Sequence, residues 1–253
     1  MGLSSNIIWH QTDINGFKAI MKSKQLSCSY SLETFLNKDH KIAFPMISLS
    51  DIPLADIGEY LNQYGGYLFG FSRQWVIENG FNPVWYCEKT NLVVEKHKKF
   101  LFDSYMKKKD AAMAPIVTLL FYYSSYMKDI EGELYVKSKN CTYSNYRFYD
   151  EREYRFVPDF DSLLGKRITP VLTEDAYKEY KEKNGNARID ISIPFKYSDL
   201  EMIIVKTVKQ ASGLQKALNK KDPSLSVHVF SHEDIKQNII GTGHQIIKEM
   251  VVK

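Results

Sequence analysis

The chain has 253 residues, 44% of them hydrophobic and 13% aromatic, which is enough apolar material to bury a substantial core. A disordered protein is therefore excluded. The formal net charge is +4, and this small excess does not by itself indicate a nucleic-acid-binding protein. The three cysteines, Cys28, Cys87 and Cys141, have no paired spacing, which favours a reducing compartment over a disulfide scaffold.

The start of the chain, Met1 to Ser5, has no basic segment followed by an apolar core, so we expect no secretory signal peptide. No apolar run is long enough to span a bilayer. Together with the cysteines, these features predict a cytoplasmic protein with no membrane partner.

Short strands and helices are predicted along the first part of the chain. Residues 7–12 are typical of a buried strand, and Asp13 or the preceding threonine is a candidate N-cap for an amphipathic helix. Residues 43–50 end in alternating apolar and hydroxyl side chains, which predicts a second strand. Residues 68–72 predict a further strand and residues 73–78 a short helix.

A helical insertion is predicted at about residues 92–130. Its second helix is apolar on nearly every side, so we expect it to be buried between other layers. Pro115 fits that helix only in its first turn. The lysines from Lys96 to Lys109 would suit a polyanion with strongly salt-dependent binding, although such a run is more often a solvated helix face.

The C-terminal part predicts a strand at residues 200–205, a helix at 212–218 and a strand at 226–230. This order is typical of a packed layer of sheet and helix. His228 and His232 are four residues apart, but the acidic residue of a zinc-binding HExxH motif is missing between them. We therefore expect no metal site.

The segment from Glu151 to Val157 alternates polar and apolar residues at the period of a strand. If this segment is extended, Glu151, Glu153 and Arg155 share one face. Two adjacent carboxylates resist joint ionisation, so the pair is costly unless a cation or a substrate compensates for it. An isolated pair of this kind is more often part of a solvated edge strand, and its role depends on which segments meet it.

Two earlier strands also place polar side chains two residues apart. His10 and Thr12 point the same way on a strand and can present an imidazole and a hydroxyl to one ligand. Ser48 and Ser50 form a second pair of this kind. The alternative for both pairs is structural, as a hydrogen-bonded strand histidine and a polar sheet face.

The order His10-x-Thr12, Ser48-x-Ser50, Glu151-x-Glu153 resembles the ADP-ribosyltransferase superfamily. Its members use a first-strand Arg or His, a second-strand Ser-x-Ser or Tyr, and a late Glu that often lies within ExE. The match takes His from one subclass and the other two motifs from the second. This resemblance implies a single α+β domain over residues 1–253, with an ADP-ribosyltransferase-like split β-sheet core.

A broader resemblance links residues 7–158 to the bacterial abortive-infection AbiGi family. It is carried by Trp9-His10-Gln11-Thr12, the segment Tyr64 to Ser72, Asn82 to Tyr86, and Glu151 to Arg155. The family implies a role in phage defence, as the antitoxin of a two-gene system, without specifying a chemistry.

The transferase resemblance implies that NAD is the substrate and that Glu153 is the main catalytic residue. Cleavage of the nicotinamide–ribose bond develops positive charge, which a carboxylate near the ribose stabilises. Glu151 would orient the nucleophile, and Arg155 would keep both carboxylates ionised. Ser48 and Ser50 would brace the sheet and position Glu153. The residues expected around NAD are His10, Thr12, Ser48, Ser50, Tyr64, Tyr67 and Arg155.

Two functions follow from these resemblances. The first is an NAD-consuming ADP-ribosyltransferase effector of phage defence, with a protein, a nucleic acid or water as the acceptor. The second is a non-catalytic binding protein on the same scaffold, which acts as the antitoxin of a cognate toxin. The presence of all three motifs favours the enzyme.

Overall fold

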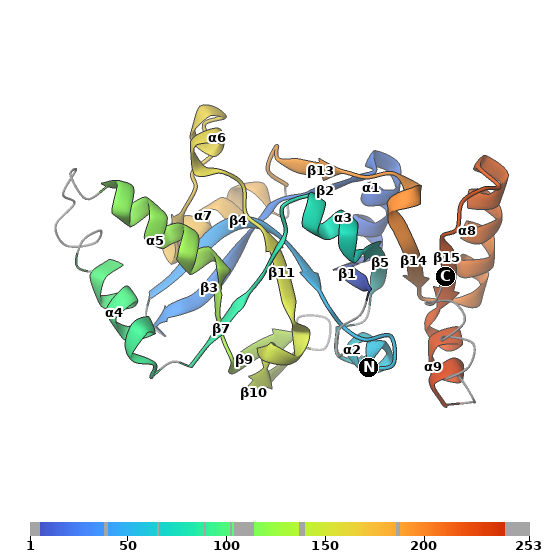
Figure 1. The fold of residues 1–253 in the computed structure, drawn as a ribbon, viewed down its shortest axis with the longest axis horizontal. Helices are drawn as coiled ribbons and strands as arrows, with labels where there is room; N and C mark the ends of the chain where they lie inside the picture. The colour runs from blue at the N-terminus through green and yellow to red at the C-terminus, as the bar shows by residue number, and fades with distance from the viewer. Residues whose placement is uncertain are drawn as a thin grey trace.

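The computed structural model describes residues 6–240, apart from residues 38–39, 65, 89, 102, 104–113, 137–139 and 186–187. A large mixed sheet crosses the molecule, with α4 and α5 at one end and α8 and α9 at the other (Figure 1). The predicted α+β class is confirmed.

The elements follow one another along the chain as strands interspersed with short helices. In order they are β1 (Ile7–Thr12), α1 (Ile14–Ser23), β2 (Gln25–Ser27), β3 (Ser29–Asn37), β4 (His40–Ser50), α2 (Ile57–Tyr64), β5 (Tyr67–Ser72), α3 (Arg73–Glu78), β6 (Asn82–Pro83), β7 (Trp85–Cys87), α4 (Leu92–Leu101), α5 (Ala114–Tyr126), β8 (Met127–Asp129), β9 (Glu131–Val136), β10 (Cys141–Arg147), η4 (Phe148–Glu151), β11 (Glu153–Phe156), α6 (Phe160–Gly165), β12 (Leu172–Thr173), α7 (Glu174–Asn184), β13 (Ser192–Pro194), η5 (Tyr197–Asp199), β14 (Leu200–Val205), α8 (Val208–Lys221), β15 (His228–Ser231) and α9 (His232–Ile240).

The main sheet has the strand order β15-β14-β5-β1-β4-β11-β6, and β3 and β12 also pair with β4. The long strand β4 joins the two halves of this sheet. Its first part pairs with β3, whereas residues 47–50 pair with β11. Among the described residues, the register of β1 with β4 consists of the pair Trp9 and Ser50. The early polar pairs therefore lie on neighbouring strands near this junction.

Both faces of the β1–β5 region are buried. Ile8 and Phe69 belong to the larger core cluster on one face, whereas Trp9 packs with the α2 residue Ile57 on the other. The Trp9 indole N–H donates to the Ile52 carbonyl at 3.0 Å. Side chains alternate across a strand, so neighbouring positions of β1 serve different cores.

Gly70 allows the close packing of β1 on β5. A Cβ atom at position 70 would lie 2.8 Å from the Trp9 ring and 2.6 Å from Ile7 Cγ2. Both distances are shorter than a normal carbon–carbon contact, so a larger residue would displace the indole. The close packing of β1 on β5 therefore requires glycine at position 70.

Local capping determines where several helices begin. The Asp13 carboxylate accepts a hydrogen bond from the Gly16 N–H at 2.7 Å, which confirms the predicted N-cap of α1. Ser72 caps α3 in the same way through the Trp75 N–H at 3.2 Å. The predicted strand-helix-strand order at the C-terminal end is also confirmed, because β14 and β15 pair in parallel with α8 between them.

Helices α4 and α5 occupy much of the segment predicted as a helical insertion, and β8 forms from its last residues. α5 begins at Ala114, so Pro115 lies in its first turn, where a helix tolerates proline. The expectation that α5 is buried on all sides is wrong, because Ile116, Leu119 and Tyr123 are 47%, 50% and 40% exposed. The helix packs one side against the body of the protein and leaves this stripe uncovered. None of the helices in the described part of the chain has the length and hydropathy that a bilayer crossing requires.

Candidate functional site

The segment around Glu151 and Glu153 is not extended throughout. Glu151 ends the 3-10 helix η4, and Arg152 has a φ of 43°, in the left-handed region. The Arg152 N–H donates to the Tyr149 carbonyl at 3.2 Å, which closes this turn. β11 spans Glu153–Phe156, so the prediction of one strand from Glu151 to Val157 is wrong for Glu151, Arg152 and Val157. A left-handed arginine is itself strained, by about 1–3 kcal/mol.

The two carboxylates nevertheless converge, because both bind Lys128. The Lys128 ammonium lies 3.1 Å from Glu151 Oε2 and 2.7 Å from Glu153 Oε2. Lys128 belongs to β8, and nothing in its sequence context distinguished it from other lysines. A cation that is distant in sequence thus supplies the compensation that adjacent carboxylates need.

Arg155 connects Glu153 to a third carboxylate. Its side chain is fully buried, with Nε at 2.7 Å from Glu153 Oε1 and Nη2 at 3.0 Å from Glu33 Oε1. Nη1 donates to the Ser125 carbonyl of α5 at 2.7 Å. We call the set Glu33, Lys128, Glu151, Glu153 and Arg155 the ion cluster.

The contacts within the ion cluster favour the charged forms of Glu153, Lys128 and Arg155. Burial alone would raise the pKa of Glu153, but Arg155 and Lys128 outweigh it and hold this pKa well below its usual range. Burial alone would lower the pKa of Lys128, but Glu153 and Glu151 raise it above that of a free lysine. A carboxylate with so low a pKa is a weak proton acceptor, so Glu153 is poorly suited to general base catalysis.

His10 and Thr12 lie on the opposite face of the sheet from Glu153. Trp9 pairs with Ser50 and Ser50 pairs with Glu153, so these three side chains share one face. His10 and Thr12 alternate with Trp9 on β1 and therefore project the other way. The expectation that His10 and Glu153 line one cleft is therefore wrong. The correction depends on the pairing register of the strands, which the sequence pattern of a single strand does not specify.

His10 is buried in this position and is bound to the backbone. Its Nδ1 lies 3.2 Å from the Ser48 carbonyl oxygen, and no hydrogen-bond partner is described for its Nε2. Burial lowers the pKa of His10 from 6.5 to about 4, with Arg188 adding to the effect. The imidazole is therefore neutral at physiological pH. Ser48 contributes its carbonyl here, whereas the prediction concerned its hydroxyl.

Ser50 lies on the same face of the sheet as Glu153 and takes part in a chain of hydrogen bonds with Tyr60 and Gln11, which we call the relay. Its Oγ lies 3.3 Å from the Tyr60 hydroxyl, which in turn donates to Gln11 Oε1 at 3.3 Å. Tyr60 comes from α2 and Gln11 from β1, so the relay ties three elements together. Neither residue was predicted as a site residue from the sequence, although Gln11 lies two residues after Trp9 and therefore shares its face of β1.

The two tyrosines that were predicted to lie near NAD, Tyr64 and Tyr67, have different environments. Tyr67 is 3% exposed, its ring stacks on Phe17 at 4.7 Å, and its hydroxyl accepts from Gln210 Nε2 at 3.1 Å. These contacts make Tyr67 a core residue. Tyr64 ends α2, and its side chain lies outside the described part of the structure.

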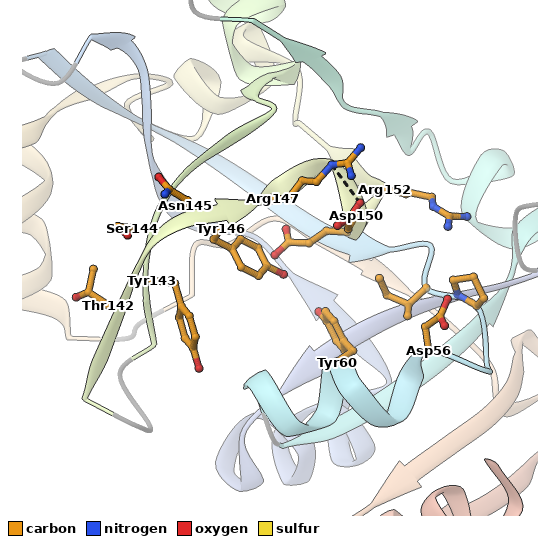
Figure 2. Close-up of a pocket in the computed structure, with 13 residues that line it drawn as sticks. Asp56, Tyr60, Thr142, Tyr143, Ser144, Asn145, Tyr146, Arg147, Asp150 and Arg152 are labelled. Atoms are coloured by element: carbon orange, nitrogen blue, oxygen red, sulfur yellow. Dashed lines mark ion pairs between the residues drawn. The ribbon is translucent and has the colours of Figure 1, made fainter. Parts of the chain in front are cut away.

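A cleft of about 700 Å³ opens beside the ion cluster (Figure 2). Tyr60 and Tyr146 both point into it, from α2 and from β10. One wall consists of β10 residues 142–147, which carry mostly hydroxyl and amide side chains. Arg147 and Asp150 form an ion pair at 3.5 Å at its edge. The cleft is therefore polar and can accept a hydroxyl-rich or charged ligand.

Of the predicted site residues, Glu151 lines this cleft, and Thr12 lines a separate pocket of about 550 Å³ on the α1 side. Lys181 and Arg188 also line that second pocket. The two predicted residues, Glu151 and Thr12, therefore belong to different pockets. Among the predicted basic residues, Lys96, Lys98 and Lys99 lie on α4, whereas residues 107–109 lie outside the described part of the structure.

Comparison with known proteins identifies the family. Residues 24–206 match the family described as "Putative abortive phage resistance protein AbiGi, antitoxin". The abortive phage resistance protein AbiGi of Lactococcus lactis subsp. cremoris is 25% identical over 199 residues, which cover 70% of this chain and 77% of that protein. The matched residues include the whole ion cluster and exclude His10 and Thr12.

No solved structure matches this chain, so an ADP-ribosyltransferase-like core stays a prediction. The family match covers well over half of the chain and agrees with the resemblance seen in its motifs. The chain therefore belongs to the AbiGi family of abortive phage resistance proteins.

Proposed function

We propose that this protein is the antitoxin of a two-gene phage-defence system and that it neutralises a cognate toxin by binding it. The family description, which names an antitoxin, is the observation that carries this proposal. A role in phage defence is common to the family and to the Lactococcus relative.

The geometry of the ion cluster supports binding over catalysis. Both oxygens of Glu153 accept hydrogen bonds from Arg155 or Lys128, and Glu153 is 5% exposed. A substrate would have to displace these cations to reach the carboxylate, at the cost of leaving charges buried and unpaired. In this proposal Glu153 stabilises the fold and takes no part in a reaction.

Co-expression tests the proposal directly. The second gene of the system is induced in a bacterial host with or without this protein, and growth is followed. Wild-type protein and the Glu151→Gln variant should both restore growth, because binding does not need a catalytic acid. Growth arrest caused by this protein alone, or failure of the wild type to rescue, would contradict it.

The second candidate is the NAD-consuming ADP-ribosyltransferase. The observation in its favour is the cleft beside Glu151 and Tyr60, whose volume of about 700 Å³ is in the range of small-molecule sites. In this alternative NAD occupies the cleft, Glu151 orients the acceptor, and Glu153 stabilises the oxocarbenium-like transition state.

Nicotinamide release from labelled NAD separates the two functions. The assay includes cell lysate as a source of protein and nucleic-acid acceptors and compares the wild type with Glu151→Gln and Glu153→Gln. Release by the wild type that both variants abolish would establish the enzyme. Equal background release by all three proteins is the result expected for an antitoxin, and circular dichroism verifies that each variant is folded.

A further inference from the structure

An apolar groove of about 690 Å³ lies between β7, α4 and α5, and it shares no lining residue with the cleft beside the ion cluster. Trp85 and Cys87 of β7, Val93 and His97 of α4, and Tyr123 of α5 line it. We call these residues the apolar groove. Figure 1 shows α4 and α5 together at one end of the molecule.

Large apolar side chains are exposed around the groove. Val93 is 72% exposed, Trp85 50% and Tyr123 40%, and the rings of Trp85 and Tyr123 lie 5.4 Å apart. Leu119 and Ile116 continue the stripe along α5. Single exposed apolar residues are ordinary, but a contiguous set around a depression is typical of a protein interaction site.

The walls of the groove are held in place from beneath. Val94 and Met127 form a small buried cluster under it. His97 Nε2 lies 2.8 Å from the Ser124 hydroxyl, which links α4 to α5. A groove with such support exists before any partner binds, so little conformational entropy is lost on docking.

The charges beside the groove indicate the chemistry of its occupant. Lys96 and Lys99 are exposed on α4, together with a single acid, Glu95. From Ala114 to Tyr126, α5 carries no charged residue. Glu88 is an acid that lines the groove itself, whereas α4 carries more lysines than acids and forms what we call the basic edge. This edge complements a segment that is apolar on one face and acidic on its flank.

We propose that the apolar groove is the docking site of the toxin, which inserts an amphipathic helix with an acidic flank between α4 and α5. A helix laid into a groove through apolar side chains at positions i, i+3 or i+4, and i+7 is a common mode of recognition. This inference rests on the proposed antitoxin function and adds the surface that performs it.

Cysteine alkylation tests the location within one molecule. Cys87 lines the groove and is half-buried, Cys141 is exposed on β10, and Cys28 is fully buried. The purified product of the second gene is added at saturation and alkylation is followed by mass spectrometry. Cys87 should become protected at least tenfold while Cys141 keeps its rate. Protection of Cys141 without protection of Cys87 overturns the proposal.

Matched substitutions test the energetics. Trp85→Ala and Val93→Asp should each weaken toxin binding by about 10- to 100-fold, because buried aromatic and apolar anchors dominate protein interfaces. Ile77→Asp on α3 and Leu164→Asp on α6 are controls, since both residues are 58% exposed but lie outside the groove. These controls should bind within twofold of the wild type. Equal effects of groove and control variants would overturn the proposal.

The basic edge has its own test. Lys96→Glu combined with Lys99→Glu should slow toxin association at least fivefold at low salt, and the difference should shrink as salt increases. Lys216→Glu combined with Lys220→Glu on α8 is the control, because those lysines are exposed at the other end of the molecule. An equal change in both double variants contradicts a localised acidic partner.

The results separate this inference from the antitoxin function itself. If the wild type and the groove variants all rescue growth and bind equally, the antitoxin function stands and the docking site is wrong. If the wild type neither binds nor rescues, the antitoxin function fails with it. If Val93→Asp instead dissociates a homodimer in the absence of toxin, the groove holds a second copy of this chain and the proposal is overturned.

Discussion

The ion cluster and the apolar groove differ in the burial and in the contacts of their side chains. In the ion cluster, Glu153 and Arg155 are almost completely buried and each charge meets an opposite charge within the protein. In the groove, Trp85 and Val93 are apolar and remain largely exposed. The region whose residues suggest chemistry is closed, whereas the region whose residues suggest a core is open.

Residue type alone therefore does not locate a functional surface. A buried charge that is fully paired contributes to folding, because removing its partner would leave an ion in a medium of low polarity. An exposed apolar residue at a groove contributes little to folding and gains most from a partner. Substitutions in the ion cluster should therefore change stability more than substitutions in the groove.

The largest effect is expected in the ion cluster. Arg155→Met should lower the free energy of unfolding by about 3–5 kcal/mol, because it leaves buried carboxylates without their cation. Arg147→Met is the control, since the Arg147 side chain is 61% exposed and its ion pair with Asp150 spans 3.5 Å. That control should cost less than about 1 kcal/mol. Urea denaturation measures both values, and similar losses would show that the cluster is not the stabilising element.

The next effect concerns His10 and its dependence on pH. Folding lowers the pKa of His10 from 6.5 to about 4, so between these values the unfolded chain binds a proton that the folded protein does not. The free energy of unfolding should therefore fall as pH falls from 6.5 to 4, by about 3 kcal/mol in total.

His10→Gln should flatten this part of the stability profile measured by urea denaturation at a series of pH values. The low pKa of Glu153 acts in the same direction but below its ordinary value of 4.5, mostly outside this window. A profile for His10→Gln that stays as steep as that of the wild type between pH 6.5 and 4 would place the proton on another group.

A smaller effect is expected at the relay beside the cleft. Tyr60→Phe removes a hydroxyl that lies 3.3 Å from both Ser50 Oγ and Gln11 Oε1, so the variant should lose about 1 kcal/mol of stability. Tyr143→Phe, on the opposite wall, should change stability by less than about 0.5 kcal/mol. Thermal unfolding distinguishes the pair, and equal melting temperatures would mean that the relay is not formed in solution.

The smallest effect is expected in the apolar groove. Val93→Ala should change the free energy of unfolding by less than about 0.5 kcal/mol, because Val93 is 72% exposed. Its neighbour Val94 is 2% exposed, and Val94→Ala should cost about 2 kcal/mol through lost burial and a cavity. Chemical denaturation of both variants tests this contrast within one helix. A large loss for Val93→Ala would mean that the groove belongs to the core.

Several elements could be predicted because their signals are local. The N-cap at Asp13, the helix at 73–78 and the strand at 200–205 follow from hydrogen-bonding side chains and from hydrophobic period. The motifs between residues 7 and 158 also indicated the AbiGi family, which the family match confirms. Neighbouring residues decide these features, so the sequence contains them directly.

The candidate site could be predicted only in part. The contact of Arg155 with Glu153 follows from their spacing on a strand, and the structure has it at 2.7 Å. Lys128 was missed because its partners are 23 and 25 residues away, and no periodic pattern links them. The separation of His10 from Glu153 depends on the registers of β1 with β4 and of β4 with β11, which no single strand specifies.

The α+β class, most of the secondary structure, and the supply of charged and apolar residues follow from local sequence patterns. Which of these residues are buried against one another and which stay exposed depends on how the whole chain packs. Arg155 is buried because Glu33, Glu153 and the Ser125 carbonyl meet around it, whereas Tyr123 remains 40% exposed although the Trp85 ring lies 5.4 Å from it. Burial is a property of the whole packed chain, so local residue patterns do not specify it.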